Sequence, residues 1–282
     1  MNHKHKKDIW TLLQHADLGK HAFLMFALLL TYIPFWLMIV ISFKTRAQYY
    51  RNPITPELPL QLENYRVAGQ VVGRYLVNSA FVTSMTILGV VIISSLAAFV
   101  FARYQFPGKR VLFLLIISLL MVPGVLTLVP AFVWIKNLGL INSHWGLILP
   151  GIAGQQVFAI FITRGYMASL PEELFEAARV DGATMFQLYW CIALPLSRPI
   201  VTVVVITSLL ATWNDFVWPL IVIGSDNLRT IPVGLSFFQT QYQTAYGAQM
   251  AGYFISSLPL LLIFVFTSRE FVRGLTAGSV KF

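Results

Sequence analysis

The stretch Ser169–Pro199, SLPEELFEAARVDGATMFQLYWCIALPLSRP, carries the clearest local structure signals of the chain. Ser169 and Glu172 have the spacing of a capping box, which predicts a helix that starts here, with Pro171 tolerated in its first turn. Asp181-Gly182 is suited to end that helix, because glycine readily adopts the left-handed conformation of a C-terminal cap. The pattern predicts a short helix and then a sharp bend.

A second short helix is predicted after the bend, because Thr184 and Gln187 repeat the capping-box spacing. Leu194-Pro195 is predicted to end it before the chain enters the next apolar stretch at Pro199. This helix is apolar on nearly all sides, and we expect more than half of that surface to fold back on the chain's own helices. The remaining surface and the segment Glu172–Gly182 are suited to dock into a groove of a soluble partner.

The segments on either side indicate a membrane protein. The chain has 57% hydrophobic and only 11% charged residues, whereas a soluble domain carries about a quarter charged residues. A helix needs roughly 20 mostly apolar residues to cross a bilayer. Six stretches qualify: Ala22–Phe43, Leu76–Phe101, Val111–Trp134, Gly146–Thr163, Pro199–Ile223 and Gly247–Thr267. The sequence therefore predicts an all-α integral membrane protein with six transmembrane helices, the fourth of them kinked or broken around Pro150.

The distribution of Lys and Arg predicts the orientation. With a cytoplasmic N-terminus, thirteen of these residues fall on the inside and seven on the outside, which favours both termini inside. The net charge of +9 then reflects membrane orientation and does not indicate a nucleic-acid partner. The first apolar run is too long for a secretory signal and is interpreted as a retained span.

Four regions follow from this topology. Residues 1–20 form a cytoplasmic N-terminal segment, in which Asp8–Lys20 is either an interfacial helix or a frayed basic tail. Residues 21–73 hold the first span and a long outside loop. Residues 74–269 form the transmembrane core with the loop at 164–198, and residues 270–282 form a cytoplasmic tail.

Several kinds of chemistry are not expected. The single cysteine, Cys191, excludes an internal disulfide, and the five histidines show no metal-ligand spacing, so no metal site is predicted. Gly19-Lys20 and Gly108-Lys109 lack the rest of a phosphate-binding loop, so no nucleotide-binding loop is predicted in this chain. No cluster of nucleophile, base and acid appears, so no catalytic residue is predicted.

The loop resembles a known family. Glu176-Ala177-Ala178, Gly182, Ile192 and Leu194-Pro195 match the EAA loop of ABC importer permeases without a gap. Further segments resemble the carbohydrate branch of that family, which includes the maltose transporter: Asn78-Ser79, Trp213-Asn214-Asp215-Phe216, Thr230-Ile231-Pro232-Val233-Gly234-Leu235 and the tail Gly274–Lys281. The likeness covers roughly the whole chain after residue 20, and the bulky Tyr189-Trp190 pair lies in a stretch that varies within the family.

This resemblance implies a type I ABC importer permease in the prokaryotic plasma membrane. Its partners would be a second homologous permease, two ATP-binding subunits and an extracytoplasmic solute-binding protein, and its cargo a carbohydrate. The loop would form the coupling helix that seats in a cleft of the ATPase subunit. The implied coupling residues are Glu176, Ala177, Ala178, Arg179, Asp181 and Gly182.

Polar residues within the predicted spans suggest a pathway for the cargo. Asp215 is the only acid inside a span, where ionisable groups are costly and usually functional. Amides and aromatic rings around it suit a hydroxyl-rich cargo, and the predicted pathway residues are Asn78, Gln155, Gln156, Trp213, Asn214, Asp215 and Trp218. The alternative is that these side chains join helices by hydrogen bonds.

The outside segment Ser225–Gln249 mixes aromatic and amide groups in a way that suits contact with a binding protein. The resemblance points to the same role, with Phe237, Phe238, Gln239, Gln241 and Tyr242 as contacts; the alternative is simple packing over the outer mouth. An ion-coupled carrier with Asp215 as its proton site is the rival function. That hypothesis leaves the two capped loop helices without a role.

Overall fold

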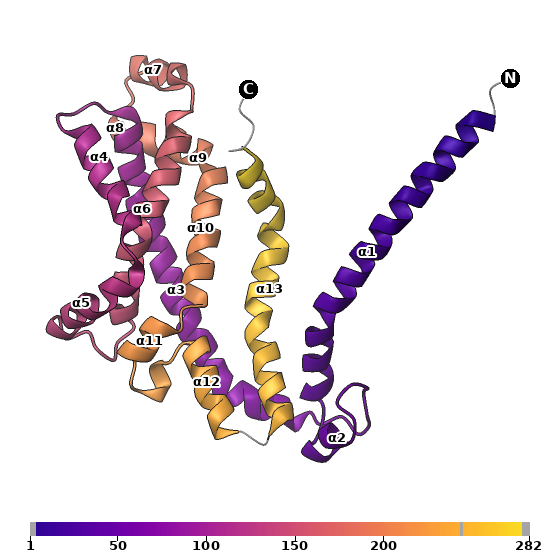
Figure 1. Cartoon of the computed structure of the whole chain (residues 1–282). Coiled ribbons are helices and arrows are strands. Elements are labelled where there is room, and N and C mark those ends of the chain that lie inside the picture. The colour runs from indigo at the N-terminus through magenta and orange to yellow at the C-terminus, as the bar shows by residue number, and fades with distance from the viewer. Residues whose placement is uncertain (1–3, 243–244, 278–282) are drawn as a thin grey trace. The chain divides into compact units, whose positions relative to one another are not determined.

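The computed structural model describes the backbone of residues 4–242 and 245–277 and the side chains of residues 19–242 and 245–265. Every regular element in these ranges is a helix (Figure 1). The main helices are α1 (Lys4–Ser42), α2 (Arg46–Arg51), α3 (Glu63–Arg103), α4 (Lys109–Ser118), α5 (Gly124–Asn137), α6 (Trp145–Ala168), α7 (Glu172–Val180), α10 (Arg198–Trp213), α11 (Val217–Val222), α12 (Ile231–Gln241) and α13 (Tyr246–Ala277). Shorter turns are η1 (Leu119–Met121), α8 (Met185–Gln187), η2 (Leu188–Ala193), α9 (Leu194–Leu196) and η3 (Asp226–Leu228).

Four helices within the described residues are individually long and apolar enough to cross a membrane. They are Gly19–Ser42 of α1, all of α3, all of α6, and Tyr246–Val265 of α13. Two bent pairs, Lys109–Met121 with Gly124–Asn137 and Met185–Leu196 with Arg198–Trp213, bring the number to six if each is one span. The all-helical membrane architecture is confirmed, with four to six candidate spans.

The helix breaks do not lie where the sequence predicts them. Of the two forms predicted for the fourth span, kinked or broken, the broken one is wrong, since α6 is one helix from Trp145 to Ala168 with Pro150 inside it. The third span breaks instead, by 102°, before Pro123, because Val122 preceding a proline takes an extended conformation. The fifth span also breaks, as α10 ends at Trp213 and α11 begins at Val217.

Pro150 is tolerated in α6 because another helix satisfies the carbonyl that it frees. Proline has no N–H, so the carbonyl of Gly146, four residues earlier, loses its helical partner. The indole Nε1 of Trp218 in α11 donates a hydrogen bond to that carbonyl at 3.0 Å, and both groups are buried. A buried partner of this kind lets a proline remain inside a transmembrane helix.

The chain divides into two compact units. One comprises Val71–Phe238 and Ser256–Phe282, and within it α6 packs against α4, α10 and α11. Figure 1 shows α7 at one end of this unit, with α5 and α11 at the opposite end. Its largest apolar clusters lie around Trp218 and around Phe175, so each end of the unit has its own core.

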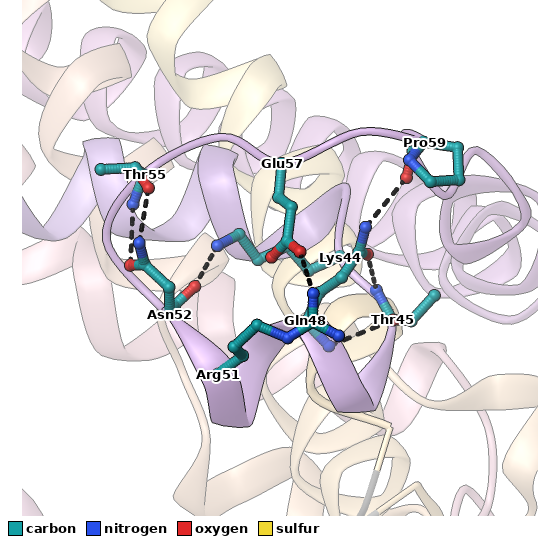
Figure 2. Close-up of polar contacts among 8 residues, drawn as sticks. All are labelled: Lys44, Thr45, Gln48, Arg51, Asn52, Thr55, Glu57 and Pro59. Carbon is teal, nitrogen blue, oxygen red and sulfur yellow. Dashed lines mark hydrogen bonds and ion pairs between the residues drawn. The ribbon is translucent and has the colours of Figure 1, made fainter.

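The other unit comprises Met1–Gln70 and Gln239–Ile255. Its connection between α1 and α3 is held together by its own polar groups (Figure 2). The fully buried ammonium of Lys44 donates to the Asn52 carbonyl, and Gln48 Nε2 donates to the Pro59 carbonyl at 3.2 Å. Thr45 and Gln48 form a capping box that starts α2. The long connection between α1 and α3 is therefore an ordered loop.

The N-terminal segment forms the beginning of α1, whose helix is continuous from Lys4. The predicted interfacial helix is therefore not a separate element. The side chains of residues 1–18 and 266–282 lie outside the described residues. Of the expected family-like tail Gly274–Lys281, only the backbone up to Ala277 is described, as the end of α13.

Candidate functional site

The loop helix α7 ends at a glycine with φ of 83°. The N–H of Gly182 donates to the Arg179 carbonyl at 3.0 Å, and the N–H of Ala183 donates to the Ala178 carbonyl at 2.9 Å. These two bonds form a Schellman motif, in which glycine avoids the clash that a Cβ would cause. The predicted C-terminal cap at Asp181-Gly182 is confirmed.

The two predicted capping boxes have different outcomes. The one at Ser169 is wrong: its hydroxyl donates to the Tyr166 carbonyl at 2.8 Å and so completes α6, and Pro171 precedes α7 without a side-chain cap. The second box is confirmed, because the N–H of Thr184 donates to Gln187 Oε1 at 2.7 Å and the Gln187 N–H donates back to the Thr184 hydroxyl. The bend between α7 and α8 is therefore built by local hydrogen bonds.

The helix α7 turns one face to the protein and the other outward. Phe175 is completely buried and Ala178 is half-buried against the same cluster. The predicted coupling residues Glu176, Ala177, Arg179, Asp181 and Gly182 are exposed. Five of the six thus lie on the outward face, while Ala178 also packs inward.

Arg103, at the end of α3, holds α7 in place. Its side chain is only 5% exposed and forms an ion pair with Glu172 at 2.6 Å. The same guanidinium donates to the carbonyls of Met167 and Leu170, each at 2.7 Å, and lies 4.0 Å above the Phe175 ring. Sequence reasoning used Arg103 only for membrane orientation and missed this role, since its partners are more than 60 positions away.

The second loop segment folds back on α3 over part of its surface. Leu188, Tyr189 and Ala193 are buried, and the Tyr189 hydroxyl lies 2.7 Å from that of Ser95. Ile192 is half-buried against the same cluster, whereas Met185, Phe186 and Trp190 are exposed. The predicted stop at Leu194-Pro195 is wrong, because the helix passes through Pro195 by way of the π-helical turn η2 and bends by 75° at Ser197.

Asn78 is buried and forms a structural tie within its unit. Its amide donates to the carbonyls of Asn227 and Arg229, both at 2.9 Å. The neighbouring Ser79 hydroxyl accepts the N–H of Ile231 at 2.8 Å. These bonds attach the connection between α11 and α12 to α3, so the Nδ2 group of Asn78 has a structural role.

Gln155 and Gln156 present amides towards the neighbouring helices. Gln155 Nε2 donates to the Thr212 hydroxyl at 3.1 Å, and Gln156 Nε2 donates to the Gly89 carbonyl at 3.4 Å. The Oε1 atoms of both glutamines are buried without a hydrogen-bond partner among the described residues. The side-chain oxygen of each glutamine can therefore still accept a hydrogen bond.

The break between α10 and α11 exposes two of the four predicted pathway residues there. Asn214 is exposed and donates to the Leu210 carbonyl at 2.9 Å; half-buried Asp215 accepts the N–H of Trp218 at 3.3 Å. Trp213 is 5% exposed inside an apolar cluster, and Trp218 is 8% exposed. The two tryptophans are therefore buried in the packed interior on either side of the break, while Asn214 and Asp215 are more accessible.

Helix α12 also has both exposed and buried side chains among the predicted binding-protein contacts. Phe237 is exposed, with the guanidinium of Arg229 only 3.5 Å from its ring centroid. Phe238, the next residue, is 2% exposed and cannot touch another protein in this conformation.

The end of α12 belongs to the other unit and carries the remaining predicted contacts. Gln239 and Gln241 are exposed, and Tyr242 is half-buried. Gln249 Nε2 donates to the carbonyls of Gln239 and Tyr242, at 3.2 and 2.7 Å. The backbone of this turn is therefore secured to the start of α13 while the amide side chains stay accessible.

Residues 90–272 match the family model described as binding-protein-dependent transport system inner membrane component. The chain is 37% identical over 260 residues to the probable ABC transporter permease protein YurM of Bacillus subtilis, covering 92% of this chain and 87% of that protein. It is 34% identical over 250 residues to the arabinooligosaccharides transport system permease protein AraQ of Halalkalibacterium halodurans, covering 86% and 89%.

The fold is also similar to a solved structure. A chain of a bacterial ABC transporter involved in the import of the acidic polysaccharide alginate superimposes with a TM-score of 0.77. The match covers 94% of this chain and 98% of that one, at 20% sequence identity. At that identity the likeness concerns the arrangement of helices.

Proposed function

Because the chain belongs to the binding-protein-dependent transport system inner membrane components, we propose that it forms half of the membrane pathway of an ATP-driven importer, with a second homologous permease as the other half. Members of this family are multi-pass permeases of the inner membrane, so the chain transports and does not itself catalyse a reaction. ATP and Mg²⁺ belong to two separate ATP-binding subunits, since the sequence has no phosphate-binding loop.

The observation that carries the coupling role is the outward face of α7. This helix is capped by a Schellman motif and anchored by Arg103, yet Glu176, Arg179 and Asp181 remain exposed. A rigid helix with an exposed polar face, on which Arg179 is paired with Glu172 at 3.0 Å, is suited to seat in a cleft of an ATPase subunit. Closure of the ATPase subunits then moves α7 and, through Arg103, the end of α3 as one body.

We assign a carbohydrate, a sugar or oligosaccharide, as the cargo. The arabino-oligosaccharide permease is a relative that shares most of its length with this chain. Asn214 and Asp215 at the helix break, with the amides of half-buried Gln155 and Gln156 in the neighbouring helix, offer groups of the kind that bind hydroxyls. We do not assign a cargo contact to Asn78, Trp213 or Trp218, because their side chains are buried. Their proposed role is to hold the surrounding helices in place.

The outside docking surface for the solute-binding protein is assigned to α12 and the turn after it. Exposed Phe237, Gln239 and Gln241, with half-buried Tyr242, provide aromatic and amide groups without charge. Phe238 is left out of this set because it is buried.

The test is transport by the reconstituted importer, with its ATPase subunits and binding protein in sealed vesicles. Uptake of an oligosaccharide should require ATP and persist when a protonophore collapses the proton gradient. Loss of uptake on adding the protonophore at constant ATP would instead support an ion-coupled carrier centred on Asp215.

The coupling face has its own variant. Glu176→Lys should abolish uptake while the complex still assembles in the membrane, because it reverses a charge on the exposed face of α7. Asn227→Lys adds a positive charge at an exposed position in the connection between α11 and α12 and serves as the control. Full uptake by Glu176→Lys would remove α7 from the coupling surface.

A further inference from the structure

A basic cavity of about 580 Å³ opens between the start of α4 and the end of α6. Its charged lining consists of Lys109, Arg110 and Arg164. Three aromatic rings, Phe101, Phe106 and Phe113, form the rest of a packed wall, with ring centroids 5.8 Å apart for Phe101 and Phe106 and 5.4 Å for Phe101 and Phe113. The cavity takes no part in the coupling or pathway roles assigned above.

The three cations have no acidic partner among the residues whose side chains are described. The Lys109 ammonium donates to the Tyr104 carbonyl at 2.7 Å. The guanidinium of Arg164 lies 4.7 Å from the Phe113 ring centroid, and its Nε is buried without a hydrogen-bond partner there. Like charges around one cavity repel each other, and a bound anion would relieve that repulsion.

The N-terminus of α4 adds a further positive end to this site. Gly108 precedes the helix with φ of 79° and provides no side-chain cap. The N–H groups of Arg110 and Val111 in the first turn have no intrahelical partner. Unsatisfied N–H groups and the helix dipole favour an anion such as phosphate at this end.

The cavity lies where a lipid headgroup would be. The predicted spans begin at Val111 and end at Thr163, so all three cations border the apolar part of their helices, on the membrane side that carries α7. Beyond the cavity, α4 exposes a run of apolar side chains: Val111, Leu112, Leu114 and Leu115. A phosphate held by the cations would thus have an apolar helix surface beside it for its acyl chains.

We propose that this cavity binds the phosphodiester headgroup of an anionic phospholipid, with Lys109 and Arg164 contacting the phosphate. The proposal rests on the membrane placement of the chain and is independent of its cargo. Basic pockets at the ends of transmembrane helices are a recognised form of headgroup site.

The experiment compares the intact importer in nanodiscs of phosphatidylcholine with and without phosphatidylglycerol. Retained lipid is measured by native mass spectrometry, and the unfolding temperature by a thermal scan. Arg164→Gln should bind phosphatidylglycerol about fivefold more weakly, the loss expected for one interfacial cation, and lose most of the rise in unfolding temperature that this lipid produces. Arg198→Gln removes one cation outside the cavity and should behave as wild type.

The source of the phosphate is decided by a second arm, in which inorganic phosphate is added to phosphatidylcholine nanodiscs. No rise in unfolding temperature with free phosphate is expected. An equal rise would overturn the lipid assignment in favour of a soluble anion. Two further results would overturn the lipid assignment. One is equal phosphatidylglycerol retention by Arg164→Gln and wild type. The other is a rise in unfolding temperature with this lipid that is absent from the intact importer and seen only after the ATPase subunits are removed.

Discussion

At the residue scale, Arg103 has the largest structural consequence for coupling. One buried guanidinium contacts the end of α6, the first residue of α7 and the ring of Phe175. Lysine cannot reproduce these contacts, because a single ammonium lacks the planar fork that bonds several acceptors at once. The link between α3 and α7 therefore depends on arginine in particular.

We predict that Arg103→Lys lowers the amount of cargo imported per ATP hydrolysed. The freed carbonyls of Met167 and Leu170 lose charged donors, at a cost of about 2 kcal/mol, and α7 can then move without α3. Uptake and ATP hydrolysis are measured on the same vesicles. Arg198→Lys, at an exposed arginine, is the control, and an unchanged ratio for Arg103→Lys would exclude the link.

At the element scale, whether a helix continues through a proline depends on the residues that pack against it. Pro123 breaks a span, while Pro150 does not, because the indole of Trp218 satisfies the Gly146 carbonyl. The difference lies in a partner that comes from another helix, 72 residues away.

This account predicts a coupling between positions 150 and 218. Trp218→Phe should destabilise the protein by about 1 kcal/mol through the lost hydrogen bond, besides any packing loss. In a Pro150→Ala background the N–H of the new alanine can bond to Gly146, so the penalty of Trp218→Phe should be smaller. A double-mutant cycle of unfolding free energies in detergent measures the difference, and additive effects would contradict it.

The end of α12 provides a second prediction at this scale. Replacing Gln239–Gln243 by a Gly/Ser stretch should leave membrane insertion intact and weaken the stimulation of ATP hydrolysis by the binding protein. Gln243 lies outside the described residues, whereas Gln239 and Gln241 are exposed. ATPase activity is titrated against binding-protein concentration, and a curve that matches the wild type would exclude this segment from docking.

At the scale of the whole molecule, the orientation in the membrane determines which surface meets which partner. The α7 loop must face the cytoplasm if it contacts ATPase subunits, and the charge distribution predicts the same. The only cysteine, Cys191, is exposed in that loop, so labelling its thiol reports on which side of the membrane the loop lies.

We therefore predict that a membrane-impermeant maleimide labels Cys191 in inverted vesicles and not in right-side-out cells. A Cys191→Ser, Asn227→Cys variant should show the opposite pattern, because exposed Asn227 lies in the connection between α11 and α12, which the charge distribution predicts to be outside. Labelling is read by mass shift. Reaction of Cys191 from outside would reverse the topology and with it the assignment of both docking surfaces.

The sequence by itself determined the membrane class, the family-like loop and the local form of that loop. Long apolar runs are enough to predict that the protein spans a membrane. The caps at Thr184–Gln187 and Asp181-Gly182 depend on residues only a few positions apart, so their hydrogen bonds can be read from spacing.

Only the tertiary structure decided which polar groups are structural and which are available. Asn78 is tied to carbonyls about 150 residues away, Phe238 is buried beside an exposed Phe237, and Arg103 bonds across more than 60 positions. It also decided that α6 runs through Pro150 while α10 and α11 part at Asn214 and Asp215. Each of these outcomes depends on partners supplied by other helices, because a buried polar group must find an acceptor or donor wherever the packing provides one.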